Sequence, residues 1–330
     1  MSAFNALPRK ASRFFAGVAL LLMAHIPNAF ADLVVSGTRV LYYNETTGAF
    51  LGVLLPTGGY NAMATGPDGN LYLISVNAAG SGSIPILRYD GRSVETFVPA
   101  GSGGLGVPTD LKFGPDGNLY VADTSGGTNS ILRFNGKTGE FMNVFASGGG
   151  MDYPSRIAFA PNGDLYAGNS RTNSDVLRYH AGTGLPYPAP GYGGAIFIQG
   201  VPDSSISALA VAPNGTVFAN TTIFAISRYD GMTGAFLGEL PSTDLSVNMA
   251  VGPDGNLYII HRMDNAVHRY SSTSGEFLDR IGGGPLQSPR SLTFACVSQH
   301  GLLKLKRCNN AEQNRNSTDS IEGSALLPPF

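Results

Sequence analysis

The chain has 330 residues, of which 44 are glycine, 43% are apolar and only 13% are charged. This balance is typical of a turn-rich all-β globular protein and excludes an intrinsically disordered chain, which has few apolar residues and a high net charge. The formal net charge is −2, and the only basic cluster is Lys304, Lys306 and Arg307 near the C-terminus, which excludes a nucleic-acid-binding protein.

Residues 1–31 have the pattern of a secretory signal peptide. Three basic residues between positions 9 and 13 precede an apolar run over 14–24, and Ala29-Phe30-Ala31 is a small-x-small cleavage site. The apolar run is shorter than the roughly 20 residues that a membrane-spanning helix needs. We therefore expect cleavage before Asp32 and a secreted protein, extracellular or periplasmic, with no membrane span. A retained N-terminal anchor is the alternative. The mature chain has 18 basic and 23 acidic residues.

The mature chain contains a repeat centred on the phrase Gly-Pro-Asp-Gly-Asn-Leu-Tyr. The phrase starts at Gly66, Gly114 and Gly252, and looser copies start at Ala160 and Ala212. The prolines of the five copies are 48, 46, 52 and 40 residues apart. A period of this length with strand-like flanks indicates a repeat architecture.

Residues 110–145 show the repeat unit most clearly. Leu111-Lys112-Phe113 alternates apolar and polar side chains, as a half-buried strand does. Pro115-Asp116-Gly117 predicts a tight turn, because proline fixes φ at one turn position and glycine accepts a positive φ at another. Further strands are expected over 118–123, 131–134 and 141–145. The unit is therefore predicted to be a four-stranded antiparallel meander.

The third-strand phrase, such as Leu132-Arg133-Phe134-Asn135, occurs six times, although there are only five proline turns. Residues 289–294 read as one more first strand, whereas 33–35, 39–44 and 49–55 supply a second, third and fourth strand without a first. Together these segments complete a sixth sheet. We predict an all-β six-bladed β-propeller of four-stranded antiparallel blades over residues 32–296, closed by strands from both termini. A seventh, degenerate blade within 182–201 is the alternative.

The repeat, and residues 108–123 most closely, resembles the NHL-type six-bladed propellers and is more distantly similar to the gluconolactonase and senescence-marker-like superfamily. The resemblance spans nearly the whole mature chain and implies the same propeller fold. Relatives of this kind include binding platforms, lactonases and lyases, so the fold alone does not choose a function. Exported bacterial proteins with such repeats often end in a Pro-Glu-Pro sorting tail. The tail over 297–330 lacks this tripeptide, which favours release, and we expect it to be poorly ordered.

The two cysteines of the chain, Cys296 and Cys308, lie at the end of the propeller and in the tail. In an exported protein they predict a disulfide that closes a short loop and stabilises the fold by about 2–3 kcal/mol. Two unpaired thiols are the alternative. No Cys-x-x-Cys pattern is present, which disfavours a structural zinc site.

We expect any ligand site at the mouth of the central channel, where the first strands begin and the second strands end. Counting five residues back from each turn proline, and to the matching point of the sixth blade, gives Ala62, Asp110, Arg156, Ala208, Asn248 and Ser291. The second strands are expected to end at Ser75, Asp123, Asn169, Thr221 and His261. These positions vary between repeats whose other residues stay constant, and blade-specific function is expected at such positions.

The first functional hypothesis is a monomeric, non-catalytic platform that binds a protein, peptide or glycan on one face of the ring. The second is a metal-dependent hydrolase of the lactonase kind, in which Asp110, Asp123, Asn169 and Asn248 bind Ca²⁺ or another divalent cation through oxygen atoms. The alternative role for these side chains is to line a water-filled channel. The resemblance also implies an acidic ligand in the first blade, where this chain has Asn61 and Ala62.

The third hypothesis is a lyase in which His261 acts with Asp110 or Arg156 as an acid–base pair. The alternative is a hydrogen-bonded structural histidine, and we expect His180 and His268 to lie far from the mouth. Arginines recur in the third strands at Arg88, Arg133, Arg178, Arg228 and Arg269. Because almost every blade has one, we expect a structural role, with the guanidinium near a turn carboxylate or carbonyl. The sequence has no phosphate-binding loop and no Gly-x-Ser-x-Gly elbow, which disfavours nucleotide binding and a serine hydrolase.

Overall fold

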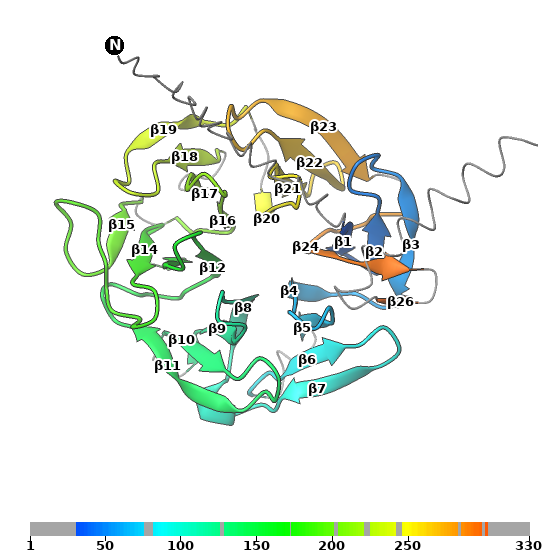
Figure 1. The fold of residues 1–330 in the computed structure, drawn as a ribbon, viewed down its shortest axis with the longest axis horizontal. Coiled ribbons are helices and arrows are strands. Elements are labelled where there is room, and N and C mark those ends of the chain that lie inside the picture. Colours follow the sequence, from blue (N-terminus) through cyan, green and yellow to red (C-terminus); the bar gives the residue numbers. More distant parts are fainter. Residues whose placement is uncertain are drawn as a thin grey trace, which may run out of the picture.

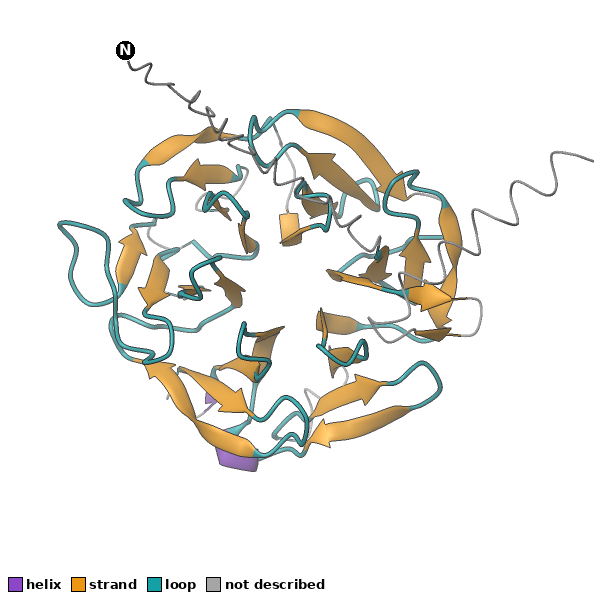
Figure 2. Cartoon of the chain, in the orientation of Figure 1, coloured by secondary structure: helices purple, strands orange, loops and turns teal. Residues whose placement is uncertain are grey.

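The computed structural model describes residues 31–75, 82–125, 129–171, 173–200, 204–220, 225–241, 246–282, 285–298 and 301–302. In this part of the chain, six four-stranded antiparallel sheets form a ring around a central axis, and there is no α-helix (Figure 1, Figure 2). The protein is therefore the predicted six-bladed β-propeller. The segment proposed as a seventh blade instead supplies the outer strand of the fourth blade.

Each blade runs from an inner strand at the channel to an outer strand at the rim. Blade 1 consists of β24 (Ser291–Ala295), β1 (Asp32–Ser36), β2 (Val40–Tyr43) and β3 (Phe50–Leu55). Blade 2 consists of β4 (Tyr60–Thr65), β5 (Leu71–Ser75), β6 (Ile86–Tyr89) and β7 (Val94–Val98). Blade 3 consists of β8 (Pro108–Phe113), β9 (Leu119–Asp123), β10 (Ser130–Phe134) and β11 (Phe141–Ser147). Blade 4 consists of β12 (Arg156–Phe159), β13 (Leu165–Gly168), β14 (Val176–Tyr179) and β15 (Ile196–Ile198). Blade 5 consists of β16 (Leu209–Val211), β17 (Val217–Ala219), β18 (Ser227–Tyr229) and β19 (Phe236–Glu239). Blade 6 consists of β20 (Ser246–Val251), β21 (Leu257–His261), β22 (Ala266–Tyr270) and β23 (Phe277–Gly282).

Among the described residues, three short elements lie outside the blades. A 3₁₀ turn, η2 (Ser102–Gly104), precedes β8, and a two-stranded hairpin of β25 (Val297–Ser298) and β26 (Gly301–Leu302) follows β24. No helix in the described part of the chain has the length and hydropathy to cross a membrane. The predicted signal peptide, most of the tail and Cys308 lie outside the described residues, so the Cys296–Cys308 disulfide stays a prediction.

The ring closes as predicted, between strands from opposite ends of the chain. In blade 1, β1 pairs antiparallel with β24, from Asp32 opposite Ala295 to Ser36 opposite Ser291. The central residues of β1 are fully buried, with Leu33 packed toward blade 6 and Val34 toward blade 2. The N-terminal strand therefore joins both neighbouring blades.

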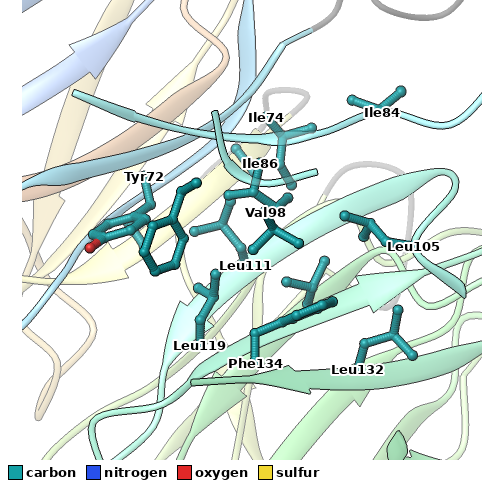
Figure 3. Packing of buried hydrophobic residues seen from close by; sticks show 14 residues of the cluster. Tyr72, Ile74, Ile84, Ile86, Val98, Leu105, Leu111, Leu119, Leu132 and Phe134 are labelled. Atoms are coloured by element: carbon teal, nitrogen blue, oxygen red, sulfur yellow. The ribbon is translucent and has the colours of Figure 1, made fainter. Parts of the chain in front are cut away.

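The hydrophobic core is divided among six clusters, one at each junction between neighbouring blades. Figure 3 shows the junction between blades 2 and 3, where Tyr72 and Ile86 of one blade pack against Leu111 and Phe134 of the other. Burying a side chain of this size stabilises the fold by roughly 1.5–3 kcal/mol. Stability is therefore spread around the ring, and each blade depends on both neighbours.

The repeated phrase forms the hairpin between the first two strands of a blade. In blade 3 the Asp116 carboxylate accepts hydrogen bonds from the backbone N and the Nδ2 of Asn118, at 3.0 and 2.7 Å, and from the Tyr120 hydroxyl at 3.0 Å. Asp68 and Asp254 accept the same three bonds in blades 2 and 6. The constancy of the phrase is explained by this structural role.

The glycines of the phrase have two separate roles. Gly117 has a φ of +74°, in the left-handed region that glycine adopts without strain. A Cβ at Gly114 would lie 2.6 Å from Cε2 of Tyr120, so the tyrosine ring needs a glycine beneath it. That ring meets Phe159 of blade 4 edge-to-face, with 4.9 Å between centroids. The hairpin therefore fixes a blade to its neighbour.

The recurring arginines also have the expected structural role. Arg178 donates to the backbone oxygens of Tyr187 and Pro188, at 2.8 and 3.1 Å, and Arg269 pairs with Asp279. The others likewise meet a carboxylate, an amide oxygen or a carbonyl, in the pairs Arg88–Glu95, Arg133–Asp116, Arg133–Asn143 and Arg228–Thr273. Each of these guanidinium groups therefore has at least one partner within the repeated frame of the ring.

Candidate functional site

A pocket of about 420 Å³ lies at the end of the ring where the first strands begin and the second strands end. This is the end at which we expected a ligand site. Five of the six blades contribute to its lining, which consists of Asn61, Ile74, Ser75, Ile84, Val107, Pro108, Thr109, Ser155, Arg156, Val247, Arg262, Pro289 and Arg290. We call this the mouth pocket.

The inner strands reach the mouth pocket through β-bulges. In blade 2, Tyr60 pairs with Ser75 and Ala62 pairs with Ile74, so Asn61 is an extra residue with no partner opposite. Thr109 is the extra residue in blade 3, between the pairs that Pro108 and Asp110 form. A bulge bends its strand and redirects a side chain, and bulges are common beside functional sites. Here they place Asn61 and Thr109 in the pocket lining.

The mouth positions that we counted from the sequence lie one residue deeper than the pocket lining. Ala62, Asp110, Ala208, Asn248 and Ser291 are buried, and only Arg156 of this set lines the pocket. In every blade except blade 5, the residue immediately before the counted position does line the pocket. These residues are Asn61, Thr109, Ser155, Val247 and Arg290. The offset is the same in blades 1 and 4, whose inner strands pair without a bulge, so the pocket lining begins one residue before the counted position whether or not the strand is bulged.

Asp110 lies beneath the pocket and joins two blades. Its Oδ2 accepts a hydrogen bond from the backbone N of Ile157 in blade 4 at 3.0 Å, and its Oδ1 accepts one from the N of Leu111 at 2.9 Å. Lys112 Nζ lies 3.5 Å from Oδ1. At the matching point of blade 1, Ser291 Oγ accepts a bond from the N of Met63 at 3.0 Å. This layer therefore ties neighbouring inner strands together.

Two other candidate metal ligands hold loops at the mouth. The Asp123 carboxylate accepts hydrogen bonds from the backbone N of Gly106 and of Ser125, both at 2.9 Å, and from the Ser125 hydroxyl. The Oδ1 of Asn169 accepts one from the N of Asp152 at 3.0 Å. The protein's own donors therefore already use these oxygen atoms.

The fourth candidate metal ligand, Asn248, is 2% exposed, and its Oδ1 has no hydrogen-bond partner in the described structure. None of the four candidate ligands, Asp110, Asp123, Asn169 and Asn248, belongs to the pocket lining. Among the described residues, no group of three or more His, Cys, Asp or Glu side chains is placed to hold a metal ion. The geometry thus gives at least three of the four side chains a structural role.

Arg156 crosses the channel at the base of the mouth pocket. Its three nitrogen atoms donate to backbone carbonyl oxygens: Nε to that of Ser207 at 2.8 Å, Nη1 to that of Ser155 at 2.7 Å, and Nη2 to that of Val247 in blade 6 at 2.8 Å. Burial lowers the pKa of the Arg156 guanidinium, and the charge of Asp110 opposes that shift. Arg156 is therefore a fixed positive charge held mainly by neutral carbonyl groups.

His261 does not line the mouth pocket with Arg156. Its ring is 4% exposed and stacks on His268, with 3.8 Å between centroids and 14° between planes. His268 does not line the pocket either, but it lies beside His261 because the antiparallel pairing of β21 and β22 sets the two rings diagonally on one face. His268 Nε2 contacts Asp264 Oδ2 at 2.8 Å, as does Arg280 Nε. His180 is exposed near Tyr187, and Thr221 lies outside the described residues.

The charged groups in the described lining of the mouth pocket are all arginines. Besides Arg156, they are Arg262, which is exposed, and Arg290, which is half-buried. The remaining lining is apolar or carries neutral polar groups. Our sequence analysis missed Arg262 and Arg290, although each lies next to a counted position, after His261 and before Ser291. The fold and this site define a six-bladed propeller with a cationic pocket at its channel mouth.

No protein-family model and no curated protein matches the chain. Solved propellers do share its fold. A chain from the crystal structure of a nidogen/laminin complex superposes with a TM-score of 0.62 at 14% identity, covering 80% of this chain and 98% of that one. The PQQ-bound aldose sugar dehydrogenase of Streptomyces coelicolor gives 0.53 at 18% identity, with 71% and 84% covered.

A gluconolactonase of Xanthomonas campestris gives a TM-score of 0.52 at 20% identity, covering 70% of this chain and 79% of that one. At these identities the likeness concerns the fold alone. It confirms the six-bladed architecture that the resemblance to NHL-type and gluconolactonase-like propellers implied.

Proposed function

We propose that this chain, after removal of residues 1–31, is a secreted platform that binds a protein, peptide or glycan ligand at the channel-mouth face. The observation that carries this proposal is the mouth pocket, to which five blades contribute. Concave sites with apolar walls and a few convergent polar groups are where proteins usually bind ligands.

The rigidity of the pocket walls supports a binding role. Bonds between blades, from the N of Ile157 to Asp110 and from the N of Met63 to Ser291, hold the inner strands directly below the lining. A site fixed before the ligand arrives loses little conformational entropy on binding. The nidogen/laminin structure shows a propeller of this architecture within a complex of two proteins.

The alternatives need groups that the pocket lining does not supply. A lactonase of the predicted kind would need Asp110, Asp123 and Asn169 to exchange their present hydrogen bonds for a divalent cation, which Asn248 would join from its buried position. A lyase would need His261 to reach a substrate beside Arg156, and its ring lies against His268. The similarity to a gluconolactonase shows that the fold accepts catalysis but assigns none to this chain.

Peptide and glycan arrays probed with the mature chain test the proposal. Asn61→Trp places an indole in the mouth pocket, at an exposed bulge residue, and Lys137→Trp is the matched control on the hairpin face. We expect the wild type and the control to bind the same array components, and Asn61→Trp to bind them at least about tenfold more weakly, or by about 1.4 kcal/mol. Unchanged thermal melting of the variants would show that the fold is intact. Equal binding by Asn61→Trp, or no binding by the wild type, would refute the proposal.

A further inference from the structure

The mouth pocket combines positive charge with apolar walls, and this combination selects one kind of ligand. We propose that it recognises the carboxylate of a peptide, either a chain terminus or an acidic side chain. Arg262 and Arg290 would bind that carboxylate above the fixed charge of Arg156. The inference rests on the proposed function and specifies its ligand.

Arg262 and Arg290 differ from the arginines of the frame because their guanidinium groups are nearly free. Arg290 Nη1 has one contact, to Asn61 Oδ1 at 3.5 Å, and Arg262 has no hydrogen bond or ion pair within the described residues. By contrast, the third-strand arginines contact Glu95, Asp279 or backbone carbonyls. A guanidinium offers five N–H donors in a planar fork that matches both oxygens of a carboxylate. The two mouth arginines therefore have donors available for a ligand.

The positive charge in the pocket is poorly compensated. The acidic group that acts on Arg156 is Asp110, which lies beneath the lining and is shared with Lys112 and two backbone N–H groups. The described lining holds no Asp or Glu. Like charges on the walls of a concave site concentrate the field within it and attract an anion. A bound carboxylate would relieve the repulsion among the three arginines.

The remaining walls fit the rest of a peptide better than a sugar. Apolar side chains surround the polar groups, namely Ile74, Ile84, Val107, Pro108, Val247 and Pro289. They can pack against an aliphatic side chain next to the carboxylate. An aromatic ring on which a sugar could stack is absent from the described lining. We therefore assign the carboxylate to a peptide rather than to an acidic glycan.

Calorimetric titration with three short peptides tests this assignment. The probes are acetyl-Ala-Leu-Val with a free carboxylate, the same peptide amidated, and amidated acetyl-Ala-Leu-Glu. The proteins are the mature wild type, the double variant Arg262→Gln/Arg290→Gln, and Arg92→Gln as a control at an exposed turn of blade 2. We expect the wild type and the control to bind at least one carboxylate peptide at least tenfold more tightly than the neutral amide. The two carboxylate probes distinguish a chain terminus from an acidic side chain.

The double variant should lose at least tenfold in affinity for the carboxylate peptide, and the wild-type affinity should fall as NaCl is raised, because salt screens charges at an open site. Equal binding of acid and amide, or full affinity in the double variant, would overturn the inference. So would binding of an oligogalacturonate with no binding of either acidic peptide.

Asn61→Trp separates the two proposals. If it abolishes binding of an array ligand that the double variant still binds, the platform stands and the carboxylate assignment is wrong. If it leaves that ligand bound, the proposed function itself fails.

Discussion

Asp116 explains why the residues of the repeated phrase are the same in several blades. Its carboxylate accepts hydrogen bonds from the backbone and the side chain of Asn118 and from the Tyr120 hydroxyl, so all three residues are needed to form the hairpin. Blade 4 keeps the interaction with the two polar residues exchanged. There Asn162 donates from Nδ2 to Asp164 at 2.9 Å and accepts from the N of Asp164 at 3.1 Å. The looser copy in blade 4 therefore keeps the bonds between the two polar turn residues, whereas its Tyr166 hydroxyl donates to the Gly231 carbonyl oxygen instead.

We expect Asp116→Ala to lower the free energy of unfolding by about 1–3 kcal/mol, because it leaves the buried end of Tyr120 and the turn donors without their acceptor. Tyr120→Phe, which removes one hydrogen bond, should cost about 1 kcal/mol. Urea denaturation measures both, with Lys137→Ala as a surface control expected to change stability by less than about 0.5 kcal/mol. An Asp116→Ala protein as stable as the control would contradict this role.

Glu45 makes the stability of the fold depend on pH. Burial, with a smaller effect from the charge of Asp254, raises the pKa of Glu45 to about 7. The folded state then binds a proton that the unfolded state releases at an ordinary carboxyl pKa. This contribution to stability is fully present below about pH 4.5 and is lost as the pH rises through about 7.

We expect Glu45→Gln to be more stable than the wild type at pH 8, by about 1–3 kcal/mol, with the difference shrinking toward pH 5. Urea denaturation at pH 5, 6, 7 and 8 measures it. Glu239→Gln, at an exposed position, is the control and should follow the wild type. A difference that stays constant across this range would show that Glu45 does not titrate as described.

At the level of elements, the strands of each blade follow from sequence pattern, whereas the bulges do not. Period-two alternation and the proline turns locate the blades and even the blade to which both ends of the chain contribute strands. The extra residues Asn61 and Thr109 leave no mark in that alternation, because their place depends on pairing with a neighbouring strand. The pocket lining is displaced by one residue from the counted positions even in blades 1 and 4, where the inner strands pair without a bulge.

We expect β1 to be indispensable to the ring. A chain that begins at Thr38 lacks a strand whose Leu33, Val34 and Val35 are fully buried, each contributing roughly 1.5–3 kcal/mol. That loss is comparable to the whole stability of a typical domain, about 5–15 kcal/mol. The truncated chain should lose its cooperative thermal transition, which calorimetry detects, and a chain that begins at Ala31 should keep it. Similar melting of the two would contradict ring closure by β1.

At the scale of the whole molecule, the six-fold frame is predictable because every blade repeats it, and the site is not, because each blade contributes a different residue. Arg262 comes from blade 6 and Arg290 from blade 1, and they line one pocket because the inner strands of these neighbouring blades lie side by side. The sequence also proposes oxygen ligands such as Asp123, but whether its carboxylate is free depends on a loop bond from Gly106.

The bonding of these oxygen atoms leads to a prediction about metal. Because backbone donors occupy Asp110, Asp123 and Asn169, we expect 1 mM Ca²⁺ or Mn²⁺ to shift the melting temperature of the mature chain by less than about 1 °C relative to EDTA. Differential scanning fluorimetry measures the shift. A stabilisation of several degrees that Asp123→Asn abolishes, together with lactone turnover, would favour the hydrolase instead.

The central claim is that this propeller binds its ligand at the channel mouth. Hydrogen–deuterium exchange tests it most directly, measured with and without a ligand identified on the peptide or glycan arrays. The account predicts ligand-dependent protection in segments 60–62, 107–110, 155–157 and 289–291, with none in the hairpins at 66–70 and 114–118 of the opposite face. Protection confined to those hairpins or to the outer strands would contradict it.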